Sequence, residues 1–239
     1  MTASGNPQPG QKAVCLLSGG LDSSTAVAIA VSRGFEVYGL TFRYGQRHEK
    51  ETRSASAVGK HLGLKDHVLV EFDLRKWGGS SLTDEIPVPT DRGSEEMSAS
   101  IPPTYVPGRN TIFLSFGLAY AETLGADRIF IGVSPVDYSG YPDCREEYLR
   151  AFEQMANLGT KAGVEGTAQF KIEAPLLHMS KAEIIRTGLD LGVDYSLTWS
   201  CYQGGEDACG RCDSCLLRLE AFRQVGMRDP VRYVDEGFG

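Results

Sequence analysis

The sequence lacks the features of a membrane or secreted protein. No apolar run approaches the roughly 20 residues that a membrane-spanning helix needs. The first ten residues, MTASGNPQPG, are polar and rich in proline and glycine, whereas a secretory signal is basic and then apolar. We therefore expect a cytoplasmic protein that has no membrane partner and begins with a disordered tail at residues 1–11.

Basic charge is also in short supply. Lys and Arg number 24 against 31 Asp and Glu, which gives a formal charge of −7. Proteins that grip nucleic acid usually carry the opposite sign, because phosphate neutralisation drives that binding. We expect no direct nucleic-acid partner. The 239 residues are 41% hydrophobic and 23% charged, a globular composition that excludes a wholly disordered chain or a fibre.

Two common nucleotide-binding motifs are absent, since neither G-x-x-x-x-G-K-[ST] nor G-x-G-x-x-G occurs. Short apolar runs instead alternate with helical segments. Strands are predicted at 13–17, 35–42, 66–72, 128–133 and 169–174, and helices at 22–34, 48–62, 110–125, 145–162, 180–191 and 213–225. This alternation predicts an α/β fold with an open parallel sheet and helices on both faces. We expect an α/β domain at 12–195 and a cysteine-rich, helical segment at 196–239.

Residues 79–108 interrupt the alternation. Five of the 11 prolines fall in this stretch, which has no clear periodicity. A long loop of this kind inside a compact domain is usually a functional lid or a disordered segment.

The first strand ends in a glycine-rich loop, Ser18-Gly19-Gly20-Leu21-Asp22-Ser23-Ser24. Two glycines let the backbone turn tightly, and the helix start behind them offers unpaired N–H groups to an anion. Asp22 could order the loop or help to hold Mg²⁺. The alternative is a Gly-Gly turn in which Asp22 or Ser23 only caps the helix.

Four of the six cysteines cluster near the C-terminus, at Cys201, Cys209, Cys212 and Cys215. Two C-x-x-C pairs in one cluster match a closed tetrahedral zinc site with no open position for catalysis. An iron–sulfur cluster and a redox dithiol are the alternatives.

Polar and aromatic residues follow the predicted strand at 128–133. The loop contains Asp137, Tyr138, Ser139, Tyr141, Asp143 and Arg145. Ligands of open α/β sheets bind beyond the carboxyl ends of the strands, and a planar heterocycle needs stacking faces and paired hydrogen-bond partners. The alternative is a Gly/Pro turn with exposed tyrosines.

Three further positions are candidates for the same end of the sheet. Arg109 and Asn110 open a helix, and the Arg109 fork could clamp a phosphate or a carboxylate. Tyr44 follows the second strand. Lys181 lies in a first helical turn, where a cation is disfavoured unless an anion faces it.

The loop 18–24 resembles the PP-loop of the ATP pyrophosphatases, S-G-G-x-D-S-[ST], which holds the β,γ-pyrophosphate of ATP. Together with YGQRH-x-x-E (44–51), VPGRN, DYSGYPDCR, the Ser180-Lys181 helix start and the cysteine cluster, it resembles the QueC family of 7-cyano-7-deazaguanine synthases. The resemblance covers residues 18–215. It assigns ATP binding to Leu16, Leu17, Ser18, Gly19, Gly20, Leu21, Asp22, Ser23, Ser24, Thr25 and Ala26.

The resemblance implies that 7-carboxy-7-deazaguanine and ammonia are converted to a nitrile with ATP and Mg²⁺, in queuosine biosynthesis. The substrate is adenylylated, ammonia displaces AMP to form an amide, and the amide oxygen is activated in the same way. Asp22, Arg109 and Lys181 are the expected catalytic residues. Substrate contacts are expected from Tyr44, Arg109, Asn110, Asp137, Tyr138, Ser139, Tyr141, Asp143 and Arg145. One structural zinc is expected at the four cysteines, and a homodimer is compatible with these features.

Other functions use similar parts. The same loop could serve a tRNA sulfurtransferase, with Cys15 and Cys144 as its cysteine pair, or another amide-forming ligase. A zinc-ribbon binding module without catalysis is the alternative from a different class.

Overall fold

One parallel sheet of five strands forms the centre of the computed structural model, which describes residues 7–46, 49–93, 96–97, 100–135 and 140–234. The strands are β1 (Lys12–Leu16), β2 (Glu36–Arg43), β3 (Asp66–Glu71), β4 (Arg128–Phe130) and β5 (Lys171–Glu173). Their order is β3-β2-β1-β4-β5. Because the chain moves outward from β1 first in one direction and then in the other, a crevice forms beyond the carboxyl ends of β1 and β4.

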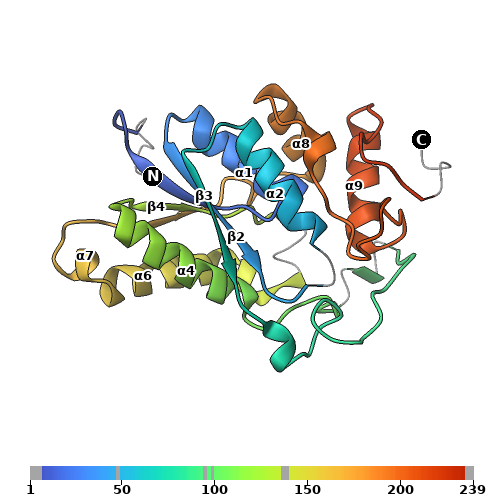
Figure 1. The fold of residues 1–239 in the computed structure, drawn as a ribbon, viewed down its shortest axis with the longest axis horizontal. Helices are drawn as coiled ribbons and strands as arrows, with labels where there is room; N and C mark the ends of the chain where they lie inside the picture. The colour runs from blue at the N-terminus through green and yellow to red at the C-terminus, as the bar shows by residue number, and fades with distance from the viewer. Residues whose placement is uncertain (1–6, 47–48, 94–95, 98–99, 136–139, 235–239) are drawn as a thin grey trace.

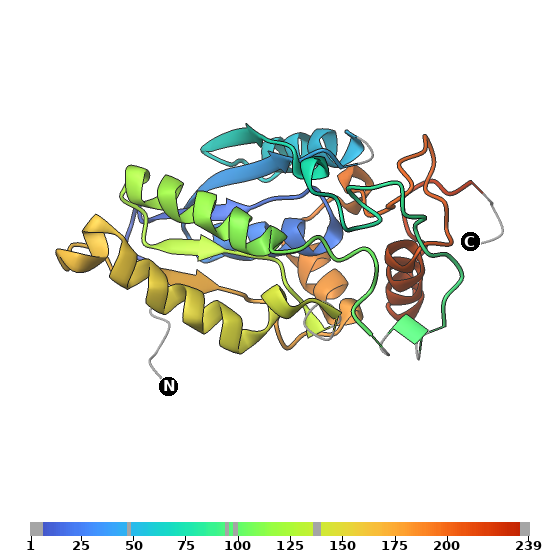
Figure 2. The same cartoon turned by 90° about the horizontal axis from the view of Figure 1, so that it is seen from below.

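Helices cover both faces of the sheet, as Figures 1 and 2 show. One layer contains α1 (Leu21–Ser32) and α2 (Lys50–His61), and the other contains α4 (Arg109–Leu124) and α6 (Glu146–Gly159). Side chains of β1 alternate between the two layers. Cys15 and Leu17 pack in the core under α1 and α2, whereas Val14 and Leu16 pack in the core under α4 and α6.

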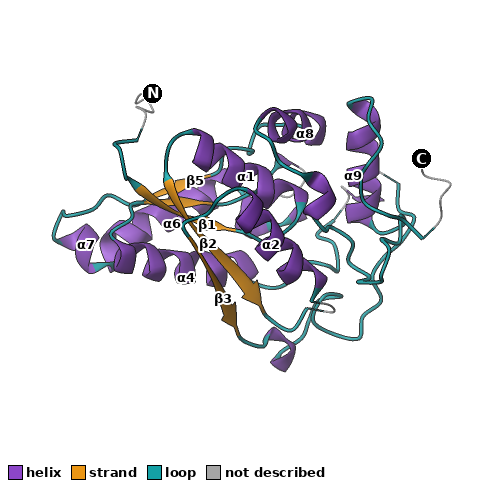
Figure 3. Ribbon diagram, turned by 45° about the horizontal axis from the view of Figure 1, so that its top comes forward, coloured by secondary structure: helices purple, strands orange, loops and turns teal. Residues whose placement is uncertain are grey.

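Two more helices extend the α1 side toward the carboxyl ends of the strands (Figure 3). These are α8 (Lys181–Asp190), which packs on α1, and α9 (Asp213–Gln224), which packs on α8. Three short 3₁₀ turns lie at Leu74–Lys76, Pro142–Cys144 and Tyr195–Leu197.

The predicted α/β fold and its order of elements are confirmed, with local differences. The strands expected at 128–133 and 169–174 are shorter, at Arg128–Phe130 and Lys171–Glu173. The helix expected at 145–162 ends at Gly159, and a separate short helix, α7 (Lys161–Val164), follows it. Thr160 separates them because its backbone is extended and its hydroxyl accepts a hydrogen bond from the Gly163 N–H, which caps the new helix. The capping box expected at Ser180 and Glu183 is present.

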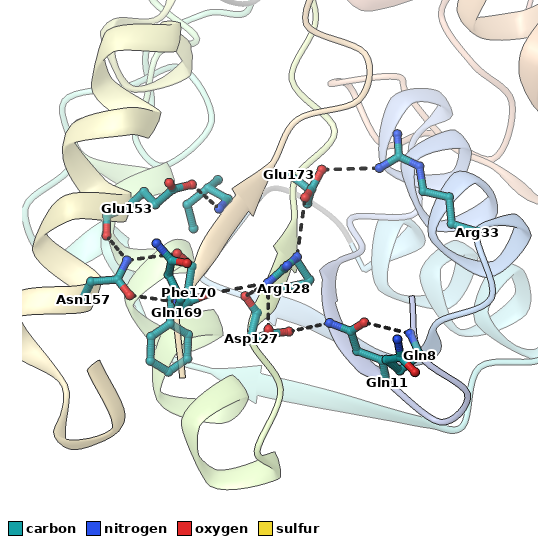
Figure 4. Close-up of polar contacts among 11 residues, drawn as sticks. Gln8, Gln11, Arg33, Asp127, Arg128, Glu153, Asn157, Gln169, Phe170 and Glu173 are labelled. Atoms are coloured by element: carbon teal, nitrogen blue, oxygen red, sulfur yellow. Dashed lines mark hydrogen bonds and ion pairs between the residues drawn. The ribbon is translucent and has the colours of Figure 1, made fainter. Parts of the chain in front are cut away.

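A polar network joins the elements at the amino ends of β4 and β5 (Figure 4). Arg128 forms ion pairs with Asp127 at 2.8 Å and with Glu173 at 3.7 Å. Glu173 also pairs at 3.3 Å with Arg33, the residue after α1. Asn157 of α6 donates to the Phe170 carbonyl and accepts from the Phe170 N–H. These contacts hold β4 and β5 to each other and to the helices beside them.

The proline-rich stretch 79–108 packs on the rest of the protein where it is described. Ser80, Ser81 and Thr104 are almost fully buried, and the Ser81 N–H donates to the Pro103 carbonyl at 2.7 Å. Near its middle, the Asp91 N–H donates to the Arg211 carbonyl at 2.8 Å. This segment therefore joins the body of the protein to the cysteine-rich region. No helix among the described residues is long and apolar enough to cross a membrane.

Candidate active site

A cavity of about 250 Å³ lies beyond the carboxyl ends of β1, β2 and β4. Its walls come from the loop after β1, the starts of α2, α4 and α8, and the C-terminal segment. The polar lining includes Ser18, Asp22, Ser23, Tyr44, Glu51, Arg109, Asn110, Tyr141, Lys181, Ser200, Tyr202, Ser214 and Arg218. The structure therefore brings residues from most of the chain to the crevice that the strand order creates.

The glycine-rich loop forms one wall, and Gly19 gives it its shape. Gly19 has a φ of +83°, and a Cβ atom there would lie 2.4 Å from the Glu51 carbonyl oxygen and 2.5 Å from the Ala55 nitrogen. The loop therefore turns directly against the backbone of α2, which only glycine permits.

The first turn of α1 faces the cavity. Its N-cap is Gly20, and none of the described side chains caps the helix, so neither Asp22 nor Ser23 is the cap. Ser23 Oγ instead lies 2.9 Å from Ser18 Oγ and accepts from the Ser18 N–H at 3.2 Å. The end of a helix without a side-chain cap, flanked by hydroxyls, is suited to an anion.

Seven residues of the expected ATP-binding set line the cavity: Leu16, Leu17, Ser18, Gly20, Leu21, Asp22 and Ser23. The others lie behind this surface. Ser24 Oγ donates to the Gly20 carbonyl at 2.7 Å, and Thr25 Oγ1 lies 2.7 Å from the Tyr195 hydroxyl. These later residues support the loop from within.

An ion pair lies at the mouth of the loop. The Lys181 ammonium, at the first position of α8, contacts Asp22 Oδ2, and both side chains are about one-fifth exposed. The position of Lys181 is unfavourable for a cation on the helix dipole alone, and Asp22 supplies the compensating negative charge.

The opposite wall combines a cation with aromatic rings. The Arg109 guanidinium donates to the Tyr44 hydroxyl at 3.5 Å and lies 5.8 Å from the centre of the Phe113 ring. Burial raises the pKa of Tyr44, against the opposing charge of Arg109, so its hydroxyl is neutral. Tyr141 stacks on Tyr105, with ring centres 6.0 Å apart. A flat, anionic ligand would find both charge and stacking surface here.

Some expected substrate residues have other positions. Asp143 does not appear in the cavity lining; its Oδ2 accepts the Asn110 N–H at 2.9 Å and so caps α4 from outside the helix. Burial raises the pKa of Asp143, although that hydrogen bond and Arg109 oppose the shift. Arg145 is exposed and precedes α6. Asp137, Tyr138 and Ser139 lie outside the described residues.

Glu51 is a cavity residue that the sequence reasoning misses. It is the second residue of α2, and burial raises its pKa from the ordinary value of 4.5 to about 7, although the Arg109 charge acts in the opposite direction. The spacing Tyr44-Gly45-Gln46-Arg47-His48-x-x-Glu51 was the available signal. A glutamate at the start of a polar helix is usually solvent-exposed, so that signal is weak.

The C-terminal segment closes the cavity, which the sequence also did not predict. The backbone N–H of Trp199 donates to the Gly19 carbonyl at 2.8 Å. The Lys50 ammonium lies 3.7 Å from the centre of the Trp199 ring. Arg218 of α9 is buried, forms a two-pronged ion pair with Asp229, and donates to Thr198 Oγ1 at 2.7 Å.

The four clustered cysteines converge beside this wall. Their sulfur atoms all lie within 4.8 Å of one another, and the group could hold a metal ion. Backbone N–H groups of Arg211 and Cys212 donate to Cys209 Sγ at 3.4 and 3.3 Å, and the Cys209 N–H donates to Cys201 Sγ. Such donors stabilise thiolates, which are the form that binds metals.

Comparisons with known proteins agree with this arrangement. The family model described as queuosine biosynthesis protein QueC matches residues 12–226. The chain is 62% identical over 226 residues to the 7-cyano-7-deazaguanine synthase of Geotalea uraniireducens, covering 94% of this chain and 97% of that protein. It is 58% identical over 231 residues to the enzyme of that name from Geobacter sulfurreducens, covering 96% of each.

A solved structure with a similar fold is that of NMN synthetase from Francisella tularensis. It superposes with a TM-score of 0.50 at 14% identity, covering 92% of this chain and 79% of that one. At this identity the likeness concerns the fold alone.

Proposed function

The chain belongs to the QueC family of queuosine biosynthesis proteins, and from this membership and the site we propose that it is a 7-cyano-7-deazaguanine synthase. It would convert 7-carboxy-7-deazaguanine and ammonia to the nitrile at the expense of ATP, releasing AMP and pyrophosphate, as a ligase that forms carbon–nitrogen bonds. The observation that carries the proposal is one cavity with an anion-binding loop on one wall and Arg109 with aromatic rings on the other.

The loop after β1 is suited to hold the pyrophosphate end of ATP. The first turn of α1 offers N–H groups, Ser18 and Ser23 offer hydroxyls, and Lys181 offers a positive charge. We propose Asp22 as the residue that would hold Mg²⁺, which would offset the charge of the triphosphate. With pyrophosphate held as the leaving group, the α-phosphate is open to attack by the substrate carboxylate.

The Arg109 wall is suited to the deazaguanine. A buried guanidinium attracts and orients a carboxylate, and Tyr44, Phe113 and Tyr141 offer apolar faces to a flat ring. Asn110 Nδ2 donates to Cys144 Sγ at 3.0 Å, which orients the amide beside the cavity. We retain Asp137, Tyr138, Ser139 and Arg145 as candidate substrate residues, and Asp143 as one that acts by holding α4.

We propose one structural zinc ion at Cys201, Cys209, Cys212 and Cys215. Four converging sulfur atoms with N–H donors fit a tetrahedral thiolate site. The role of the metal would be to hold the segment that contains Trp199 and Arg218 against the loop.

The direct partners proposed are therefore small molecules, namely ATP, ammonia and the deazaguanine, with no nucleic acid or membrane. We further propose a cytoplasmic location, and a homodimer remains compatible with the chain.

Mass spectrometry of the products formed with ATP, Mg²⁺, ammonia and 7-carboxy-7-deazaguanine tests this function. We expect nitrile, AMP and pyrophosphate. Asp22→Ala should reduce turnover at least 100-fold, whereas Asp66→Ala, on the edge strand away from the cavity, is the matched control. AMP without nitrile would indicate another adenylylating ligase, and no ATP-dependent product would refute the proposal.

The sulfurtransferase alternative receives no support from the cysteine positions. Cys15 packs in the core under α1 and α2, and Cys144 packs in the core on the other face of the sheet. The sheet therefore separates the two thiols, and they cannot act as a pair.

A further inference from the structure

Glu51 stands out among the charged groups of the cavity. Its backbone carbonyl packs against Gly19 of the glycine-rich loop, and its side chain lines the same cavity as Arg109. Asp22 pairs with Lys181, and Arg218 pairs with Asp229. In the part of the chain that the structure describes, the Glu51 carboxylate forms neither an ion pair nor a hydrogen bond.

The titration of Glu51 is set by groups on several elements. Burial raises its pKa to about 7, the Arg109 charge opposes that shift, and the negative charge of the Cys201 thiolate adds to it. Other charged or titratable side chains around the cavity are Asp22, Tyr44, Lys50, Tyr141, Lys181, Tyr202 and Arg218. Near neutral pH the carboxyl group therefore exists in both protonation states, and it can accept a proton and return it.

The proposed reaction requires such a group. Ammonia attacks the acyl carbon of the first adenylate, the bond from that carbon to the AMP oxygen breaks, and one proton leaves the nitrogen. The amide oxygen then attacks the α-phosphate of a second ATP, and pyrophosphate leaves. When AMP departs, the same nitrogen loses its two remaining protons as the carbon–nitrogen triple bond forms.

We propose that Glu51 is a catalytic residue whose carboxylate receives the protons that leave this nitrogen and passes them to solvent. The inference rests on the proposed function. The other cavity groups are less suited: Lys181 and Arg109 are cations, and Asp22 is held by Lys181. Burial also raises the pKa of the Tyr44 phenol, and a phenol that keeps its proton cannot act as the base.

The test separates adenylylation from the steps at nitrogen. Glu51→Gln keeps the shape of the side chain and removes its titration. Substrate-dependent exchange of labelled pyrophosphate into ATP reports adenylylation, and amide and nitrile are quantified with ammonium chloride between pH 6 and pH 9. Glu49→Gln, an exposed glutamate two residues earlier, is the matched control.

We expect Glu51→Gln to retain exchange within about threefold of the wild type and to lose about 100-fold or more in nitrile formation, the usual contribution of a general base. Glu51→Asp should restore part of the rate of nitrile formation, and the acidic limb of its pH–rate profile should be shifted from that of the wild type. Unchanged nitrile formation in Glu51→Gln would overturn the proposal. Loss of exchange in both variants would also overturn it, since Glu51 would then act in binding.

Two further outcomes are distinguishable. If the wild type exchanges pyrophosphate and makes no nitrile, the proposed function fails rather than the role of Glu51. If Glu51→Gln does not fold, the pH–rate profile of Glu51→Asp is the deciding measurement. An acidic limb identical to that of the wild type would overturn the proposal.

Discussion

Glu51 makes the stability of the protein depend on pH in a direction that can be calculated. Its pKa is raised from 4.5 to about 7 in the folded state, so folding favours the protonated acid. The resulting stability is fully present below the unfolded pKa and is lost as pH rises through the folded pKa. Ionising the partly buried carboxyl group therefore destabilises the native protein between about pH 4.5 and pH 7.

The magnitude follows from the two pKa values. Each unit of difference corresponds to about 1.4 kcal/mol, so the shift from 4.5 to about 7 amounts to roughly 3 kcal/mol as an upper limit. Glutamine mimics the protonated acid at every pH. The advantage of Glu51→Gln over the wild type should therefore grow by about 2–2.5 kcal/mol between pH 5 and pH 8. For a chain of this length, that gain corresponds to a difference in Tm of roughly 5–10 °C.

Thermal unfolding of both proteins at pH 5 and pH 8, at constant ionic strength, measures this difference. Any pH dependence of the cysteine cluster is common to the two proteins and cancels in the comparison. A Tm difference between Glu51→Gln and the wild type that stays the same at both pH values would refute the reasoning, because burial would not then control the titration of this group.

Three further predictions concern the walls of the cavity. Arg218→Met should leave the buried Asp229 carboxylate without a positive charge beside it, and should lower the free energy of unfolding in urea by about 3–5 kcal/mol. Arg218→Met combined with Asp229→Asn should recover much of that loss. Gly19→Ala should abolish ATP binding by equilibrium dialysis, because the new Cβ would lie 2.4 Å from a backbone oxygen. Gly10→Ala is the control, because Gly10 has a similar φ and open space around it; this variant should lower the free energy of unfolding by only about 1 kcal/mol. Removal of a metal from the cysteines with a chelator should shift the fluorescence emission of the buried Trp199 to longer wavelength, measured in a Trp77→Phe variant so that Trp199 alone is observed. An unchanged spectrum would contradict the proposed link between the cysteine cluster and the loop.

Much of the fold was predictable because its signals are local. A buried strand followed by glycines and a helix start predicts a strand–loop–helix unit without knowledge of the rest of the chain. The capping box at Ser180 and Glu183 is equally local, and it is confirmed. The break at Thr160 was missed although it had a local signal, because Gly159 is a poor helix former and threonine is a preferred N-cap residue.

The candidate site was predictable only in part, since burial and partners depend on the fold. Asp143 and Glu51 are both acidic residues that come shortly after a predicted strand in the sequence. In the structure, Asp143 accepts a hydrogen bond at the start of α4, whereas Glu51 lines the cavity. The two roles differ because the start of α4 lies beside Asp143 and offers it an N–H group. The sequence does not reveal which helix start lies close to a given carboxylate.

The most consequential part that the sequence did not reveal is the dependence of the loop on the C-terminal segment. The backbone N–H of Trp199 donates to the Gly19 carbonyl on one side of the loop. On the other side, the Tyr195 hydroxyl contacts Thr25. Arg218 binds the Tyr195 carbonyl, so α9 supports the segment between them. Because the contacts of Trp199 with Gly19 and of Arg218 with Tyr195 cross the expected boundary at residue 196, we expect a perturbation of the cysteine cluster to reach the loop. A metal bound at the proposed cysteine site would therefore influence catalysis through the shape of the loop, even without an open coordination position.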